Sequence, residues 1–331
     1  MDDSEVLKPL KTWSHLASRR RKPSEYEIVS TNLTYDGDNP DAPFEMDPNM
    51  EMAQWFRQYR HGAALKHPDW EAFRDPDELV YRTYNLLQDG QEAYVFGLLD
   101  QFSARGHDVM LERHWAGTLA RLYTPARFLF HALQMGSAYL AQMAPASTIV
   151  NCAVFQAADS LRWLTHTAYR TKELSSTFKE MGFGSDERRY WEQGPAWQGW
   201  RKLVEHALVA WDWGESFVAL NLVVRPAVEG AVLRGLGQAA RQNGDTLLGL
   251  LIDADLADAQ RHRRWAAKLV EMALTQEANR PVIAGWLKKW EPLADDAVSR
   301  YCSALPDVQE AEEETIAAAR DFRRGMGLSS S

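Results

Sequence analysis

The nine histidines are the residues of this chain best suited to bind a metal ion. In a helical bundle, a di-iron site needs a Glu-x-x-His motif on each of two helices, because residues three apart share a helix face and reach one ion. The residues three positions before the nine histidines are Thr, Gln, Ala, Ala, Leu, Phe, Trp, Leu and Ala. None is acidic, so we predict that this chain forms no catalytic, cofactor-binding or metal site.

Other catalytic motifs are also absent from the sequence. There is no His-x-x-x-His or His-Glu-x-x-His pair for zinc, no Gly-x-Ser-x-Gly turn of a hydrolase and no Gly-x-x-x-x-Gly-Lys loop for phosphate. Glu205 with His206, and Asp258 with His262, have acid–base spacing, but most such pairs are ordinary hydrogen bonds. The residues alone therefore predict a helical protein without a site of its own.

Long helices are the elements that would position these residues. Apolar residues recur at helical spacing from Leu79 to Phe102, after an Asp75-Pro76-Asp77-Glu78 segment that has the residue types of a helix start. Similar patterns continue almost to the end of the chain. Helices of around thirty residues are about 45 Å long, and few strand patterns compete with them. We predict an all-α fold, a bundle of long antiparallel helices.

The first 74 residues differ from the rest of the chain. Six prolines interrupt any long helix there, and residues 27–35 have strand-like composition without a partner strand. Nine aromatic residues in the same segment argue against plain disorder. We therefore divide the chain into an extended Pro-rich arm (1–74), a helical domain (75–305) and a C-terminal helical tail (306–331) that we expect to be frayed.

The composition excludes several classes of function. A net charge of −9 and a pI of about 5.5 argue against a nucleic-acid-binding protein. The acidic N-terminus is no signal peptide. The longest stretch without charge runs from Phe128 to Ala158, but it is broken by Pro145 and contains several polar residues, so we expect no membrane span. The two cysteines fit a reducing compartment, and we predict a cytoplasmic protein.

Five segments of the sequence are long enough to identify a protein family. They are residues 11–16 (KTWSHL), 22–26 (KPSEY), 75–92 (DPDELVYRTYNLLQDGQE), 144–148 (APAST) and 164–170 (LTHTAYR). Together they resemble the β subunit of the hydroxylase component of bacterial multicomponent toluene/o-xylene/benzene monooxygenases, in the soluble di-iron monooxygenase family. β subunits of phenol hydroxylase and soluble methane monooxygenase are more distant relatives.

The resemblance implies a fold and an assembly. The fold is a ferritin-like long-helix bundle, a degenerate di-iron fold. The hydroxylase of the family is an (αβγ)2 assembly in which the α subunit holds the di-iron centre that activates O2 for hydroxylation of the aromatic ring. An effector protein, a Rieske ferredoxin and a reductase that delivers electrons from NADH complete the system. No nucleic acid and no membrane take part.

The same resemblance places the former metal-ligand positions in this sequence. Ser160 occupies the place of a Glu and Trp163 the place of a His in one ligand segment. Ala259 replaces the Glu of the second segment, although His262 is retained, and Asp212 stands at another ligand position. We expect the former site to be packed rather than hollow. Asp212 and His262 are either a buried hydrogen-bonded pair or unrelated polar residues.

These expectations define the predicted function. The chain is a non-catalytic structural β subunit that scaffolds the α subunit, with Trp13, Arg20, Arg21, Tyr26 and Tyr35 of the arm as candidates for the partner interface. The alternatives are a β subunit of a phenol or alkane monooxygenase of the same family, or a self-contained di-iron oxidoreductase. An apolar-ligand carrier is a third class, which Trp163 in the core would oppose.

Overall fold

The computed structural model describes residue 16, residues 22–33, residue 47 and residues 49–328. Within these ranges the regular structure is entirely helical. The α-helices are α1 (Glu25–Ser30), α2 (Glu51–Phe56), α3 (Tyr81–Ala104), α4 (His107–Met110), α5 (Arg113–Thr118), α6 (Ala126–Met143), α7 (Ser147–Thr177), α8 (Glu187–Gln193), α9 (Pro195–Ala207), α10 (Trp213–Phe217), α11 (Arg225–Val228), α12 (Leu236–Gln242), α13 (Thr246–Ala273), α14 (Asn279–Cys302) and α15 (Ala311–Gly325). Shorter π-helical segments are η2 (Arg57–His61), η4 (Leu119–Tyr123), η5 (Val218–Val224) and η6 (Glu229–Gly235), and η3 (Trp70–Ala72) is a 3-10 turn.

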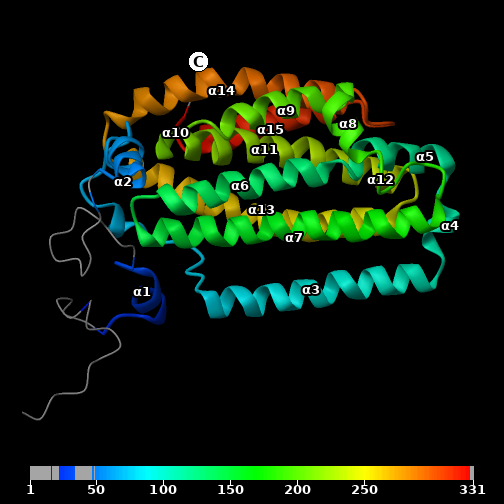
Figure 1. The fold of residues 1–331 in the computed structure, drawn as a ribbon, viewed down its shortest axis with the longest axis horizontal. Helices are drawn as coiled ribbons and strands as arrows, with labels where there is room; N and C mark the ends of the chain where they lie inside the picture. The colour runs from blue at the N-terminus through cyan, green and yellow to red at the C-terminus, as the bar shows by residue number, and fades with distance from the viewer. Residues whose placement is uncertain (1–15, 17–21, 34–46, 48, 329–331) are drawn as a thin grey trace, which may run out of the picture.

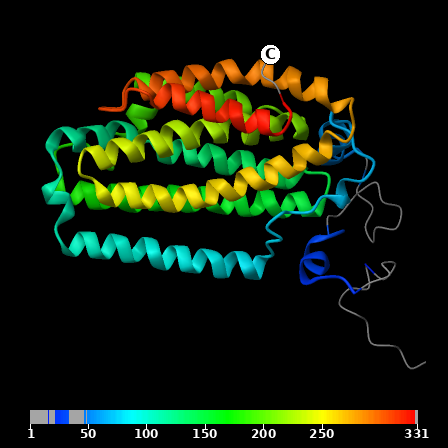
Figure 2. The same cartoon turned by 180° about the vertical axis from the view of Figure 1, so that it is seen from behind.

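The long helices lie side by side in an elongated bundle. The antiparallel pair α6 and α7 packs along its length, and α3 forms the outer edge of the bundle, where it packs against α13 and lies below α7 in Figure 1. From behind, α12 and α13 form the corresponding antiparallel pair (Figure 2). Helices α9, α14 and α15 cover the face opposite to α3. The predicted bundle of long antiparallel helices is confirmed.

The predicted start of the third helix was wrong by several residues. Asp75 does not cap it: its carboxylate accepts hydrogen bonds from the amides of Asp77 (3.0 Å) and Leu79 (3.2 Å), which closes a turn. Glu78 then has a φ of 47°, outside the helical range, and α3 begins only at Tyr81. Asp75 therefore caps the amides of a turn that precedes the helix, and the Glu78 side chain binds Arg74 Nε (2.6 Å) instead of closing a capping box.

Only the first part of the strand-like segment 27–35 can be compared with a helix: residues 27–30 belong to α1, residues 31–33 are irregular, and residues 34 and 35 lie outside the described residues. Ser24 and Glu27 form a capping box, in which each side chain binds the backbone amide of the other, and α1 follows. Tyr26 on this helix is buried, and its hydroxyl accepts a hydrogen bond from the amide of Asp75 (3.0 Å). Local capping thus overrides the β propensity of Ile28 and Val29.

The helix from Trp213 to Gln242 crosses the centre of the bundle and contains Pro226. Proline has no amide hydrogen, so the carbonyl four residues before Pro226, that of Leu222, lacks the N–H donor that an α-helix would supply. Arg323 of α15 supplies a donor, because its Nη1 lies 3.0 Å from the carbonyl oxygen of Leu222. This helix is long and apolar enough to cross a membrane, but its apolar window is entirely buried in the protein, as in the core helix of a globular fold.

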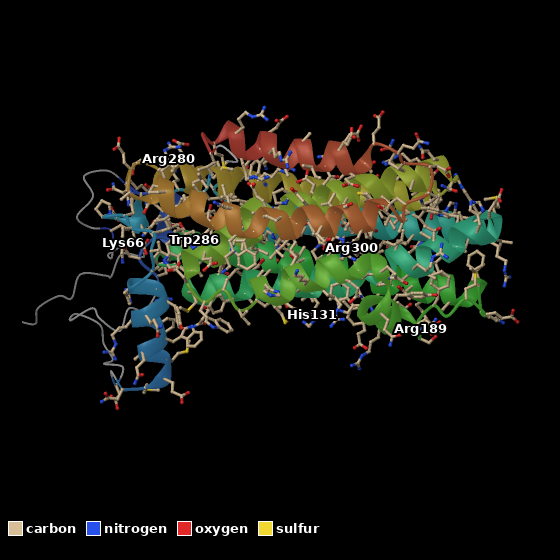
Figure 3. The ribbon with its side chains drawn as sticks, turned by 90° about the horizontal axis from the view of Figure 1, so that it is seen from above. Lys66, His131, Arg189, Arg280, Trp286 and Arg300 are labelled. Atoms are coloured by element: carbon tan, nitrogen blue, oxygen red, sulfur yellow. The ribbon has the colours of Figure 1, made fainter. Side chains whose placement is uncertain are left out.

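The C-terminal helix is packed rather than frayed. Arg323 is buried and pairs with Glu291 of α14 (2.8 Å). Thr315 packs against Gly230, where a Cβ atom would lie 2.4 Å from the threonine Cγ2. Arg280, at the start of α14, donates a hydrogen bond to the carbonyl of Gly327 (2.6 Å), and its position is visible from above in Figure 3. The helical tail is therefore an integral layer of the bundle.

An aromatic layer fills the space between α9 and α14. We use this name for the buried residues Trp197, Trp200, Trp290 and Tyr301. Trp197 and Tyr301 meet edge to face, with ring centroids 5.2 Å apart. Gly199 permits the close approach of the two helices, since a Cβ atom at this position would lie 2.5 Å from the Cα of Ala297. Charged side chains reach the layer at Trp290, whose Nε1 donates to Glu215 Oε1 (3.2 Å) and whose ring faces Lys289 Nζ (4.7 Å), whereas the contact of Trp197 with Tyr301 depends on ring shape.

Candidate functional site

Four of the five positions at which the resemblance predicts former metal ligands converge in the bundle core. Ser160 and Trp163 lie on α7, and Ala259 and His262 lie on α13. Trp163, Ala259 and His262 line a cavity of about 10 Å³, roughly the space of one water molecule. Trp163 is only 2% exposed. The region is therefore packed, as predicted, and holds no ligand-sized hollow.

Asp159 is the centre of the polar groups in this region, and its exposure is 0%. Its Oδ1 accepts hydrogen bonds from the Tyr84 hydroxyl (2.8 Å) and from Gln88 Nε2 (2.8 Å). Its Oδ2 accepts from Arg261 Nη2 (2.5 Å) and from His262 Nε2 (2.8 Å). Burial raises the pKa of this carboxyl, but the His262 hydrogen bond and the charge of Arg261 outweigh it, so the pKa of Asp159 lies below its ordinary value.

His262 is held in one tautomer by its two neighbours. Its Nε2 faces the Asp159 carboxylate and donates a proton, so its Nδ1 is the acceptor and faces Arg225 Nη1 at 3.2 Å. Burial lowers the pKa of His262 to about 4, with a further contribution from Arg225. The imidazole is therefore neutral near pH 7.

Arg225 enters the cluster from the helix that contains Pro226. Its Nη2 donates to Ser137 Oγ on α6 and to Ser160 Oγ on α7, both at 2.8 Å. Burial lowers the pKa of Arg225 to about 9, against the favourable charge of Asp159, so the guanidinium remains protonated near neutral pH. The residue lies between the π-helical segments η5 and η6, a local geometry that is frequent at functional sites.

Asp258 extends the cluster toward the surface. Its Oδ1 accepts from Gln88 Nε2 and Arg261 Nη2, both at 3.0 Å. Its Oδ2 accepts from Arg162 Nη1 (3.0 Å) and Trp163 Nε1 (3.2 Å). Arg162 in turn binds Glu92 of α3 (2.7 Å). We call the set Asp159, Arg225, Asp258, Arg261 and His262, with their hydrogen-bonding partners, the charged cluster.

The charged cluster does not fit a metal centre. Both oxygens of Asp159 and both nitrogens of His262 are engaged by protein groups, so no donor is left for an ion. No group of three His, Cys, Asp or Glu residues with metal-binding geometry occurs among the residues that the structure describes. Two positively charged guanidinium groups inside the cluster also oppose cation binding electrostatically.

Asp212 and His262 do not form the pair that we considered. Asp212 precedes α10 and caps it, accepting hydrogen bonds from the amides of Gly214 (2.8 Å) and Glu215 (3.1 Å). Its other oxygen accepts from the amide of Ala64 (2.8 Å). His262 binds Asp159 instead. The capping bonds to α10 and the bond from Ala64 hold Asp212 outside the core. Asp212 and His262 are therefore unrelated polar residues.

The two short-range acid–base pairs are absent as well. The Asp258 carboxylate binds Arg261, Gln88 and Arg162, while the His262 imidazole binds Asp159 and Arg225. On α9, His206 Nδ1 lies 2.6 Å from the carbonyl oxygen of Lys202. These side chains make ordinary hydrogen bonds, as we expected for most pairs with this spacing.

One candidate for a partner interface lies among the described residues. The Tyr26 side chain is 5% exposed and its hydroxyl accepts a hydrogen bond from the Asp75 amide, so this ring packs inside the chain. Trp13, Arg20, Arg21 and Tyr35 lie outside the described residues.

Sequence analysis did not single out Arg225, although the sequence carries a signal for it. Arg225 is the only charged residue between Glu215 and Glu229, in a run that is otherwise apolar apart from Ser216 and Asn221. A lone arginine in such a run has to be buried with partners, because an unpaired buried charge is very costly. The partners themselves, on three other helices, could not be read from the run.

The chain matches known proteins over most of its length. The family model described as Methane/Phenol/Alkene Hydroxylase matches residues 52–277. The toluene-4-monooxygenase system hydroxylase component subunit beta of Ectopseudomonas mendocina is 58% identical over 301 residues, which are 91% of this chain and 92% of that protein.

Further relatives agree with this match. The phenol 2-monooxygenase oxygenase component DmpL of Pseudomonas sp. (strain CF600) is 26% identical over 81% of this chain and 80% of that protein. A solved structure of toluene 4-monooxygenase with toluene in the resting active site contains a chain that superposes with a TM-score of 0.86 at 57% identity, covering 91% of this chain and 99% of that one. The bundle is thus the ferritin-like helical fold of such hydroxylases.

Proposed function

This chain belongs to the methane/phenol/alkene hydroxylase family, and from that premise we propose that it is the non-catalytic structural β subunit of an aromatic-ring hydroxylating di-iron monooxygenase. The observation that carries this proposal is the 58% identity, across 91% of the chain, to a protein named as the β subunit of such a hydroxylase. The activity is an NADH-dependent oxidoreductase reaction with O2, performed by the complex.

The charged cluster supports a non-catalytic role. The former ligand positions hold Ser160, Trp163 and Ala259, and His262 is bound to Asp159 and Arg225. The di-iron centre would accordingly lie on the partner α subunit. A self-contained di-iron oxidoreductase disagrees with this arrangement, because the oxygen and nitrogen donors near the former site are already engaged.

The partners follow from the family. We propose that the chain scaffolds an α subunit and assembles with γ subunits into an (αβγ)2 hydroxylase in the cytoplasm. An effector protein, a Rieske ferredoxin and a reductase would complete the system. The arm (residues 1–74) would contribute to the partner interface, and the helical domain (75–305) together with the C-terminal tail (306–331) would form the body of the subunit.

The substrate class that the relatives favour is an aromatic hydrocarbon such as toluene, benzene or o-xylene. The toluene-4-monooxygenase relative is 58% identical, whereas a phenol 2-monooxygenase component is 26% identical and propane 2-monooxygenase small subunits are 23% identical. The phenol and alkane alternatives are correspondingly disfavoured. Toluene is therefore the substrate to test first.

Co-expression with the neighbouring hydroxylase genes tests the proposal. The complete set should yield a co-purifying complex that contains iron and oxidises toluene when it is supplied with the electron-transfer proteins. Omission of this chain should abolish the assembly and the toluene oxidation. Two iron ions bound to this chain when it is expressed alone, or full activity in its absence, would contradict the proposal.

A further inference from the structure

We propose that the Arg225 guanidinium is a built-in cation that takes the place of a metal ion in the bundle, and that its removal leaves a site for a free guanidinium ion. The inference rests on the geometry of the charged cluster, and it does not depend on which partner or substrate the hydroxylase has.

The orientation of His262 is the first argument. A metal-bound histidine typically coordinates the ion through one ring nitrogen and donates the other N–H to a carboxylate, which fixes the ring. His262 has this arrangement: its Nε2 lies 2.8 Å from the Asp159 carboxylate, and its Nδ1 faces Arg225 Nη1 at 3.2 Å. A guanidinium N–H therefore stands where the ion of such a triad would stand.

The groups that accept hydrogen bonds from the guanidinium also form a site for a cation. Arg225 Nη2 is bound by Ser137 Oγ and Ser160 Oγ at 2.8 Å, with the Leu133 carbonyl at 3.5 Å. The resemblance places a former metal ligand at Ser160. At this position the Ser160 hydroxyl accepts a hydrogen bond from Arg225, where a ligand side chain would bind an ion. These acceptors come from α6 and α7, and His262 comes from α13.

Charge is the third argument. Asp159 is completely buried and ionised, and a buried carboxylate needs a positive charge close by. Arg261 supplies one cation directly, at 2.5 Å. Arg225 supplies a second one through the neutral imidazole of His262. Because arginine presents several N–H donors in one plane, it binds two serine hydroxyls and the imidazole at the same time, which a lysine ammonium at the same place would not reproduce.

Chemical rescue of Arg225→Ala in the full chain tests the proposal. The variant loses the cation and opens a planar, acceptor-lined space, so we expect its Tm to fall by about 10 °C. Low millimolar guanidinium chloride should raise that Tm again in a saturable manner, whereas urea and sodium chloride at the same concentrations should not. The wild type should show no such gain.

Two further variants keep the result decisive. Leu133→Ala enlarges the same region without removing the cation, so its lower Tm should not respond to guanidinium. Arg225→Met fills the space without a charge and serves if the alanine variant does not fold; we expect it to be less stable than the wild type. Equal or higher stability of Arg225→Met, absence of rescue in a folded Arg225→Ala, or equal rescue by urea would each overturn the proposal.

A metal titration gives an independent readout. Because Arg225 occupies Nδ1 of His262, Co2+ added to the wild-type chain should give no visible absorption that depends on His262. A Co2+ spectrum that is present in the wild type and lost in His262→Gln would show that the imidazole is free to bind an ion, and would also overturn the proposal.

Discussion

The charged cluster and the aromatic layer are both buried in the same bundle, but they are stabilised in different ways. In the charged cluster, Asp159 alone accepts four hydrogen bonds from two other helices, α3 and α13. In the aromatic layer, Trp200 is 0% exposed, yet its Nε1 has no hydrogen-bond partner within the described part of the chain. The first region is stabilised mainly by paired charges, although Arg225 Nε and Gln88 Oε1 have no hydrogen-bond partner among the described residues, and the second mainly by the fit of ring volumes.

The difference predicts how each region responds to mutation. Removing one member of a buried ionic network leaves the remaining charges uncompensated, which costs more than the lost bond itself. A change of shape in an apolar layer costs in proportion to the cavity or the overlap that it creates. The four predictions below use this contrast, in order of decreasing effect.

Asp159→Asn should have the largest effect. It preserves the shape of the side chain but removes the negative charge that Arg261 and His262 face, so we expect a loss of about 3–5 kcal/mol in the free energy of unfolding. Urea denaturation of the full chain measures it. Asp77→Asn is the control, because Asp77 pairs with half-exposed Arg264 and should cost less than about 1 kcal/mol. Similar losses for the two variants would contradict the contrast.

Acidification should act through His262. The folded-state pKa is about 4 and the ordinary value is 6.5. Between these values the unfolded chain binds a proton that the folded chain does not, so stability falls as the pH falls, by about 3 kcal/mol from pH 7 to pH 4.

Denaturation series at several pH values check this effect. His262→Gln should be less stable at pH 7 but should lose less stability on acidification than the wild type. His206→Gln changes an exposed histidine and should keep the wild-type slope. An unchanged slope in His262→Gln would show that other groups control the acid response.

Gly199→Ala tests the aromatic layer by overlap. A Cβ atom at this position would lie 2.5 Å from a backbone atom of α14, which cannot move aside as a side chain can. We expect a loss of about 2 kcal/mol in the free energy of unfolding. Gly285→Ala on α14 is the matched control, since nothing lies within 4 Å of a Cβ atom there. It should be neutral or slightly stabilising because alanine favours helix.

The same substitution in both regions gives the smallest and most direct comparison. Trp163→Phe removes the indole donor of the Asp258 carboxylate, whereas Trp200→Phe removes an N–H without a partner among the described residues. Both leave a similar volume unfilled. Trp163→Phe should therefore be more destabilising by about 1 kcal/mol, measured by urea denaturation. If Trp200→Phe were the more costly change, the fit of the aromatic layer would outweigh the pairing of the charged cluster.

Local patterns in the sequence predicted the long helices well and the irregular segments poorly. The apolar periodicity from Leu79 to Phe102 identified most of α3 (Tyr81–Ala104), because helical spacing of apolar residues is a strong signal over so long a segment. Asp75 and Glu78 have the types of a helix start but form a turn, and Ser24 with Glu27 starts a helix in a segment that resembled a strand. Short motifs of this kind predict that a side chain will cap a backbone amide. They do not predict whether a turn or a helix follows.

The sequence by itself determined that this chain has no Glu-x-x-His motif, and it predicted the burial of Trp163. Only the tertiary structure decided which groups surround His262 in the core. Asp159, Arg225 and His262 are 37 to 103 positions apart in the chain and meet only after α7, α13 and the Pro226 helix have packed. Hydrogen-bond partners across helices depend on helix rotation and register, which the pattern of one helix does not contain. For that reason the pairing of Asp212 with His262 was plausible from the sequence and wrong in the structure.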